Sequence, residues 1–265
     1  MKTAADSYVL FSEVKGEGMD IILLHGWGMH GGIWGSFKEL LADNFKTHTL
    51  DLPGYGFSQQ MKNEFDLDAI SAEVERYIKN ISKPVVILGW SLGGLIALNL
   101  LKRKNISIYK IVLIATSPCF TRKDNWDEAM ESSVFNAFAA ELQHDYKKTI
   151  KRFLSLQTRG SELARDELRL LNDKIFERGE PSMQALKKGL DILSKTDTRD
   201  IREQIVPALM ILGDKDTLVP VAVMTEFKKM FPNNEQLILE KTGHAPFITA
   251  AEKSAESVKN FIHAK

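Results

Sequence analysis

The chain has 265 residues, of which 44% are hydrophobic and 26% charged, a composition typical of a globular protein with one α/β domain and an insertion, or two small domains. Its 35 basic and 35 acidic residues cancel, so no net charge attracts nucleic acid or an anionic membrane. A single cysteine, Cys119, excludes an intrachain disulfide, and the N-terminal residues lack the apolar run of a signal peptide. We therefore expect a cytoplasmic monomer that binds neither nucleic acid nor membrane.

The first half of the chain alternates between apolar runs and segments of helical periodicity. Strands are expected at 7–15, 20–24, 45–50, 85–88 and 108–115. Helices are expected from about Trp34 to Leu41, over 67–81, and after Ser91. Such alternation implies right-handed crossovers and a mostly parallel central sheet flanked by helices. Ligands in such sheets bind beyond the carboxyl ends of the strands.

The pattern changes between residues 120 and 200. This segment has no convincing strand and is rich in lysine, arginine and glutamate, so we interpret it as a helical cap (lid). Strands resume at 206–212 and 236–240, with helices at 221–230 and 251–263. The expected domains are a core of residues 1–119 and 201–265 and a cap of residues 120–200, inserted before the penultimate strand.

One stretch, residues 84 to 98, combines a strand, a sharp turn and a helix. Residues 89 to 93 fit the pattern G-x-S-x-G, which presents a serine hydroxyl at the apex of the turn. A membrane span is the alternative, because residues 84 to 101 carry no charge. Three glycines, Ser91 and Asn99 interrupt the stretch and disfavour that alternative.

A serine becomes nucleophilic when a base takes its proton and a third group orients the base. His244 follows the last strand and is the histidine best placed to reach Ser91. Asp214 and Asp216 both follow the penultimate strand. Asp216 lies further out and is favoured as the acid, whereas Asp214 is expected to close the turn. The order serine, acid, histidine is typical of the α/β-hydrolase fold.

The tetrahedral intermediate of acyl transfer needs two donors for its oxyanion. The backbone N–H after the nucleophile belongs to Leu92, and Trp27 is best placed to supply the second from the loop at 25–28. No metal-ligand motif and no complete dinucleotide fingerprint is present, so we expect no metal and no cofactor.

Five motifs together resemble the α/β-hydrolase superfamily: His25-Gly26, the segment 51–58, Gly89-Trp90-Ser91-Leu92-Gly93-Gly94, the segment 213–220, and Gly243-His244. A narrower resemblance is to the pimeloyl-[acyl-carrier protein] methyl ester esterase family of biotin biosynthesis. It rests on the segments 23–29, 89–95, 116–120, 152–158 and 244–248. The resemblance implies a serine carboxylesterase that cleaves the methyl ester of a carrier-bound pimeloyl chain. It also implies substrate contacts from Trp27, Ser91, Leu92, Phe153, Leu154, Ser155, Leu156, Gln157 and His244.

The cap carries basic residues in pairs spaced four apart, Lys148 with Arg152 and Arg165 with Arg169, each pair on one helix face. Carrier proteins are acidic, so a basic rim on the cap would steer one to the pocket. The resembling family uses basic residues at these four positions, with arginine where this chain has Lys148. The alternative is a solvated helix face balanced by acidic neighbours, namely Glu162, Asp166 and Glu167.

Two other classes of function fit parts of the pattern. A general short-chain carboxylesterase or a carbon–carbon bond hydrolase has the same triad and differs in the cap. A hydrolase-like binding module with a vestigial triad is disfavoured, because all three triad candidates are present.

Overall fold

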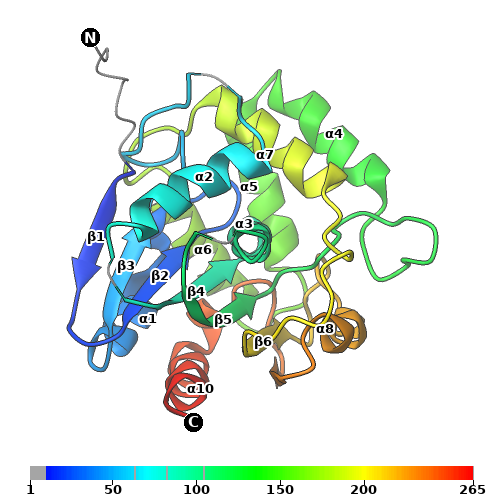
Figure 1. Cartoon of the computed structure of the whole chain (residues 1–265). Helices are drawn as coiled ribbons and strands as arrows, with labels where there is room; N and C mark the ends of the chain where they lie inside the picture. Colours follow the sequence, from blue (N-terminus) through cyan, green and yellow to red (C-terminus); the bar gives the residue numbers. More distant parts are fainter. Residues whose placement is uncertain (1–9, 63, 82, 104, 265) are drawn as a thin grey trace.

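The computed structural model describes residues 10–62, 64–81, 83–103 and 105–264 (Figure 1). Seven strands form one sheet: β1 Ser12–Lys15, β2 Asp20–Leu24, β3 Lys46–Leu50, β4 Val85–Trp90, β5 Ile108–Ile114, β6 Ala208–Gly213 and β7 Asn234–Leu239. Their order is β1-β3-β2-β4-β5-β6-β7. Strand β1 pairs antiparallel with β3, and every other neighbouring pair is parallel. The expected mostly parallel sheet is confirmed.

Helices cover both faces of this sheet. Their bounds are α1 Gly35–Ala42, α2 Leu67–Ile78, α3 Leu92–Leu100, α4 Ser132–Leu142, α5 Tyr146–Gln157, α6 Ala164–Lys174, α7 Met183–Lys195, α8 Met224–Met230, α9 Pro246–Thr249 and α10 Ala251–His263. Helices α1, α9 and α10 pack together on one face, and α2 and α3 pack together on the other. Central strands β2 and β4 are buried along their whole length, because both faces are covered.

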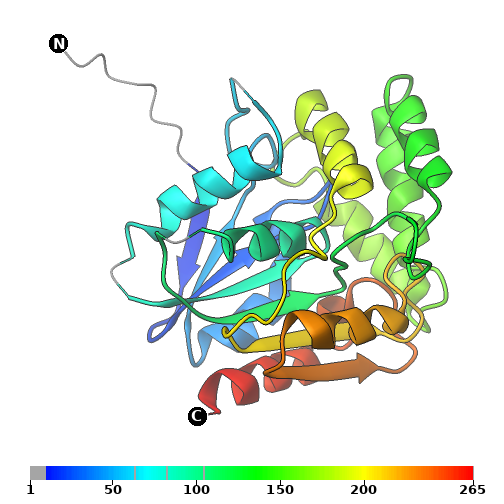
Figure 2. The ribbon, with the colours of Figure 1, turned by 45° about the vertical axis from the view of Figure 1, so that its right-hand side comes forward.

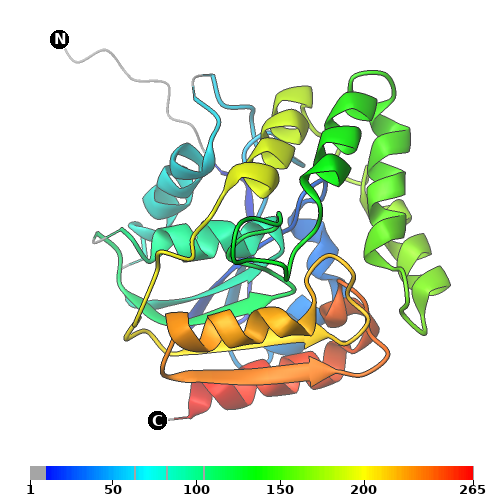
Figure 3. The same ribbon diagram turned by 90° about the vertical axis from the view of Figure 1, so that its right-hand side faces the viewer.

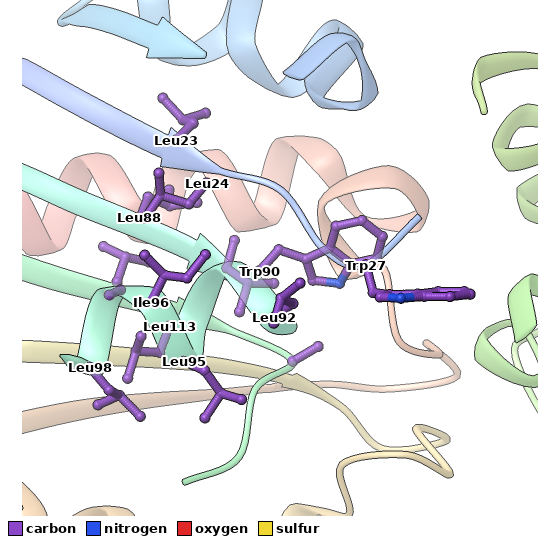
Figure 4. Packing of buried hydrophobic residues seen from close by; sticks show 14 of the residues in the cluster. Leu23, Leu24, Trp27, Leu88, Trp90, Leu92, Leu95, Ile96, Leu98 and Leu113 are labelled. Carbon is purple, nitrogen blue, oxygen red and sulfur yellow. The ribbon is translucent and has the colours of Figure 1, made fainter. Parts of the chain in front are cut away.

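The stretch at 84–101 is divided between β4 and α3. Helix α3 is apolar on all sides, and each of its residues is buried against the sheet, α2 and α7. Figure 4 shows Leu24 of β2, Leu88 of β4 and Ile96 of α3 in this cluster. No helix among the described residues is long and apolar enough to cross a membrane. The uncharged character of the stretch therefore follows from burial between a sheet and its covering helices.

Helices α4 to α7 all come from the segment at 120–200. They lie beyond the end of the sheet toward which the parallel strands point (Figures 2 and 3). Arg178, after α6, fixes this segment to the core. Its guanidinium donates to Asp51 Oδ1 at 3.0 Å and lies 2.6 Å from Glu13 Oε2, and its side chain is buried. Asp51 follows β3, so the ion pair joins the helical segment to the edge of the sheet at the carboxyl ends of the strands.

Several expected boundaries differ from the observed ones. The first expected strand begins at residue 7, but residues 7–9 lie outside the described residues and β1 begins at Ser12. Helix α2 ends at Ile78 rather than at 81, and β7 begins two residues before the expected 236. The expected helix at 221–230 is a 3-10 turn, Val221–Val223, followed by α8. The one-turn helix α9 was not anticipated, since four residues are too few to show helical periodicity.

Candidate active site

Ser91 occupies a strained turn between β4 and α3. Its φ of 53° and ψ of −115° are rare for a residue with a side chain, and its N–H donates to Ile114 O at 3.0 Å. The turn is possible because its flanking glycines lack side chains. A Cβ on Gly89 would lie 2.4 Å from Gly93 O, and a Cβ on Gly93 would lie 2.1 Å from Leu24 O. Gly89 is therefore required by the close approach of α3, and Gly93 by close packing of the turn on the end of β2.

His244 and Asp216 form a buried pair beside this turn. Nδ1 of His244 lies 2.7 Å from Asp216 Oδ2, and both side chains are fully buried. The other carboxylate oxygen, Oδ1, accepts hydrogen bonds from the N–H groups of Leu218 at 2.8 Å and Val219 at 3.0 Å. These bonds fix the carboxylate, which in turn directs Nδ1–H of the imidazole toward itself. Nε2 of His244 is buried and has no hydrogen-bond partner among the described residues.

The loop that carries His244 is also tied to the nucleophile turn. Nε1 of Trp90, the residue before Ser91, donates to His244 O at 2.8 Å. Trp90 is the variable residue of the first x in G-x-S-x-G, and it is fully buried. This hydrogen bond joins the residue before the serine to the histidine loop, a role that no spacing rule indicates.

Asp214 has a different environment from Asp216. Its Oδ1 accepts from Thr242 N–H at 3.3 Å, and its Oδ2 lies 2.9 Å from Lys215 Nζ. The hydrogen bond from Lys215 is the main cause that lowers the pKa of Asp214. The structure therefore pairs Asp216 with His244 and places Asp214 in the turn. The catalytic role of Asp216 stays a prediction.

His25, in the loop after β2, is a structural residue. Its Nε2 accepts from Leu52 N–H at 2.9 Å, and its Nδ1 lies 2.8 Å from Gly26 O. Burial lowers the pKa of His25 to about 3, so the imidazole is neutral. It joins the loops after β2 and β3 and is not available as a base. This geometry holds the segment that carries Trp27.

Trp27 connects this loop to the cap helices. Its Nε1 donates to Leu186 O of α7 at 2.9 Å, and its ring centroid lies 4.8 Å from that of Phe153 of α5. A Cβ on Gly189 of α7 would lie 2.6 Å from Trp27 Cδ1. Figure 4 shows Trp27 beyond the end of β2, apart from the strand residues. The second oxyanion candidate, Leu92, is the first residue of α3, where backbone N–H groups lack helical acceptors.

Helix α5 presents only part of the expected substrate segment to the interior. Phe153, Leu154 and Gln157 are buried, Leu156 is half-buried, and Ser155 is exposed. Both amide atoms of Gln157 are buried without a hydrogen-bond partner among the described residues. The buried members share one helix face, at spacings of three and four, and Ser155 lies on the other. The structure therefore does not bring Ser155 to the site.

The four basic residues expected to meet the carrier protein, Lys148, Arg152, Arg165 and Arg169, are all exposed. Arg152 forms an ion pair with Glu141 and lies over the Phe138 ring, and Arg169 pairs with Asp166 at 3.3 Å. Ion pairs of this exposed kind contribute little to stability and are easily exchanged. The side chains are therefore available to an incoming acidic surface.

The alternative interpretation of these basic residues, a solvated helix face with acidic neighbours, is wrong for Glu167. Glu167 is 1% exposed and lies on the inner face of α6. The sequence contains a signal for this, because Glu167 lies four residues before Leu171 and eight before Ile175, which form the buried stripe. Because Glu167 is charged, a search for apolar residues at helical spacing does not include it.

No group of three or more histidine, cysteine, aspartate or glutamate side chains within the described ranges is arranged to hold a metal ion. The site instead has the parts of a covalent acyl-transfer centre: a serine at a strained turn, an imidazole with a free Nε2 and a carboxylate on its other nitrogen.

The chain matches the model of the alpha/beta hydrolase fold over residues 21–251. It is 39% identical over 251 residues to a pimeloyl-[acyl-carrier protein] methyl ester esterase of Xanthomonas oryzae pv. oryzae, covering 94% of this chain and 97% of that protein. A protein of the same description from Vibrio parahaemolyticus is 37% identical, with 93% and 95% covered. Among solved structures, an esterase from Exiguobacterium antarcticum superposes with a TM-score of 0.87 at 22% identity, covering 98% of both chains.

Proposed function

The chain belongs to the α/β-hydrolase family and, within it, to the pimeloyl-[acyl-carrier protein] methyl ester esterases, and from this we propose that it hydrolyses the methyl ester of a carrier-bound pimeloyl chain. The observation that carries the proposed chemistry is the buried His244–Asp216 pair. Its Nε2 has no partner among the described residues, and its loop accepts a hydrogen bond from Trp90, the residue before Ser91. The substrate comes from the relatives, whose names specify it. As an enzyme of biotin synthesis it would act in the cytoplasm.

In the acylation half-reaction, Ser91 Oγ attacks the carbonyl carbon of the ester while His244 Nε2 takes the serine proton. Asp216 holds the Nδ1–H tautomer and stabilises the imidazolium that forms. The carbonyl oxygen becomes an oxyanion that accepts from the N–H groups of Trp27 and Leu92. The intermediate collapses, the C–O bond to the methoxy group breaks, and the imidazolium donates its proton so that methanol leaves.

In the deacylation half-reaction, water attacks the acyl-enzyme and gives its proton to His244. The bond to Ser91 Oγ breaks, the serine recovers its proton from the imidazolium, and the free pimeloyl carboxylate is released. The net reaction consumes one ester and one water and yields one acid and one methanol. No redox partner or cofactor enters this balance.

The cap supports the substrate proposal in two ways. The buried rings of Trp27 and Phe153 lie 4.8 Å apart, and such apolar surroundings suit the methylene chain of a pimeloyl group. Outside, Lys148, Arg152, Arg165 and Arg169 offer exposed positive charge to an acidic carrier protein. Lys148 contributes charge without the bidentate geometry of an arginine.

Two experiments test this function. A serine-reactive fluorophosphonate should label the wild-type protein and not Ser91→Ala, whereas an unlabelled wild type would reject the hydrolase assignment. Pimeloyl methyl ester on carrier protein should be hydrolysed far faster than free dimethyl pimelate, which separates this function from a general carboxylesterase. Rescue of a biotin auxotroph would test the pathway.

The docking role of the basic residues needs a matched comparison. Charge reversal in Arg152→Glu/Arg169→Glu should remove most of the preference for the carrier-bound ester and leave hydrolysis of the free ester unchanged. Lys253→Glu, at an exposed position of α10 outside the segment 120–200, is the control and should keep the preference. An unchanged preference in the double variant would show that the carrier docks elsewhere.

A further inference from the structure

Glu167 is a buried carboxyl that the proposed catalytic cycle does not use. It lies on the inner face of α6 and is 1% exposed. Arg165 and Arg169 lie two positions away on either side, which places them on the outer face of the same helix. Glu167 is therefore separate from the basic rim, although it shares a helix with it.

The carboxyl packs against the loop that carries His244. A Cβ built on Gly243 would lie 3.7 Å from Glu167 Oε2, so the side chain closes directly over this loop. The Ser161 hydroxyl and the Ala245 N–H lie near enough to lower the pKa of Glu167. No hydrogen bond of standard geometry reaches either carboxylate oxygen from the described residues. A buried carboxyl without such hydrogen bonds destabilises the folded protein, so its presence calls for a functional reason.

The Glu167 carboxyl changes its protonation state near neutral pH. Burial raises the pKa of Glu167 to about 7, the Ser161 hydroxyl and the Ala245 N–H oppose the rise, and the negative charge of Asp216 adds to it. The titratable groups that the two neighbouring core loops carry next to this carboxyl are thus Asp216 and His244. The neighbouring Glu162–Lys241 ion pair is exposed to solvent, so its field is screened.

We infer that Glu167 is a positioning residue, which holds the loop Gly243–Ala245 from the cap side and places negative charge near the His244–Asp216 pair. The inference rests on the proposed function, in which His244 is the general base. A second contact from the cap acts on the same loop, since His244 N–H donates to Gln157 O at 3.0 Å. Ionised Glu167 favours the imidazolium that forms when Ser91 is deprotonated.

Two variants separate the positional from the electrostatic effect. Glu167→Ala removes both the packing and the charge, and kcat on a small carrier-free nitrophenyl ester should fall about tenfold, because the histidine loop loses its support from the cap side. Glu167→Gln keeps the shape and an acceptor, so it should recover most of that kcat. Because it lacks the charge, the acid limb of its kcat/KM profile should move to lower pH. Asp173→Ala, an exposed carboxylate on the same helix, is the matched control and should resemble wild type in both.

A wild-type acid limb in Glu167→Gln would overturn the inference, because a merely structural residue gives that result. Should Glu167→Ala fail to fold, Glu167→Gln decides alone. Fluorophosphonate labelling of Ser91 in wild type distinguishes failure of the proposed function from failure of the role inferred for Glu167. An unlabelled wild type rejects the hydrolase function itself, whereas a labelled wild type with an unshifted Glu167→Gln profile rejects only the role of Glu167.

Discussion

The backbone N–H of His244 donates to the carbonyl oxygen of Gln157 across 3.0 Å, which binds the histidine loop to the end of cap helix α5. A second backbone bond of 2.9 Å runs from Glu162 N–H to Lys241 O, just before the same loop. Two backbone hydrogen bonds from the α5–α6 region therefore fix the position of the histidine loop. A cap that opened as one rigid lid would break both bonds, so any opening motion is expected to spare the α5–α6 turn.

The two aspartates after β6 should differ sharply in their effect on catalysis. Asp216→Asn should lower kcat by about 10⁴-fold, because the amide supports the wrong tautomer of His244. Asp214→Asn loses only a surface ion pair with Lys215 and should change kcat by less than about threefold. Steady-state kinetics on a small ester measure both. Equal effects of the two variants would mean that the observed pairing does not operate in turnover.

The glycine after the nucleophile turn should be intolerant for steric reasons. A Cβ on Gly93 would meet the backbone oxygen of Leu24 at 2.1 Å, and that oxygen belongs to a buried central strand that cannot move. We expect Gly93→Ala to reduce the free energy of unfolding by at least about 3 kcal/mol. Urea denaturation measures this.

A second glycine provides the comparison. Gly179 has a φ of 94° but no atom within 4 Å of a built Cβ, so Gly179→Ala tests backbone strain without a clash. Its cost should be about 1–2 kcal/mol. A loss for Gly93→Ala no larger than that for Gly179→Ala would show that β2 can retreat.

The buried ion pair between Arg178 and Asp51 should matter for stability more than the exposed pairs. Arg178→Met leaves the fully buried Asp51 carboxylate without its cationic partner and should destabilise the protein by about 3–5 kcal/mol. Glu13→Gln removes the other partner of Arg178, which is half-exposed, and should cost less than about 1 kcal/mol. Chemical denaturation of both variants checks the contrast, and similar losses would place the stabilising effect in the exposed pair.

The pH dependence of stability should report on Glu167. Its pKa is about 7 in the folded protein against a usual 4.5, so the folded state binds the proton more tightly than the unfolded state. Stability is therefore lost as the pH rises from about 4.5 to about 7 and stays reduced above that. Relative to wild type, Glu167→Gln should gain on the order of 2 kcal/mol between pH 5 and pH 8. Denaturation midpoints at the two pH values measure this, with Asp173→Asn as the control. If the difference between wild type and Glu167→Gln were the same at both pH values, the pKa of Glu167 would be that of an ordinary carboxyl.

The local parts of the site were predictable because each follows from neighbours in the chain. The strand–turn–helix around Ser91 depends on glycines at fixed spacings, and the positions of Asp216 and His244 after two late strands follow from the order of a parallel sheet. The fold class and the family rest on the same local motifs, and both are confirmed. Sequence periodicity also located the strands and the helices α1, α2, α3 and α10 within a few residues, whereas it gave no bounds for α4 to α7.

What the sequence alone determined was the chemistry, since a nucleophile, a base and an acid are set by residue type and by strand order. Tertiary structure decided the choice of partners, because that choice depends on distances between segments far apart in the chain. It paired Asp216 rather than Asp214 with His244, turned Ser155 outward, and placed Trp90 under the histidine loop. It also buried Glu167, whose charge had suggested a solvated face. The physical reason is that Glu167 on the inner face of α6 packs on Gly243 of the histidine loop, 76 residues further along the chain, a contact that no local pattern encodes.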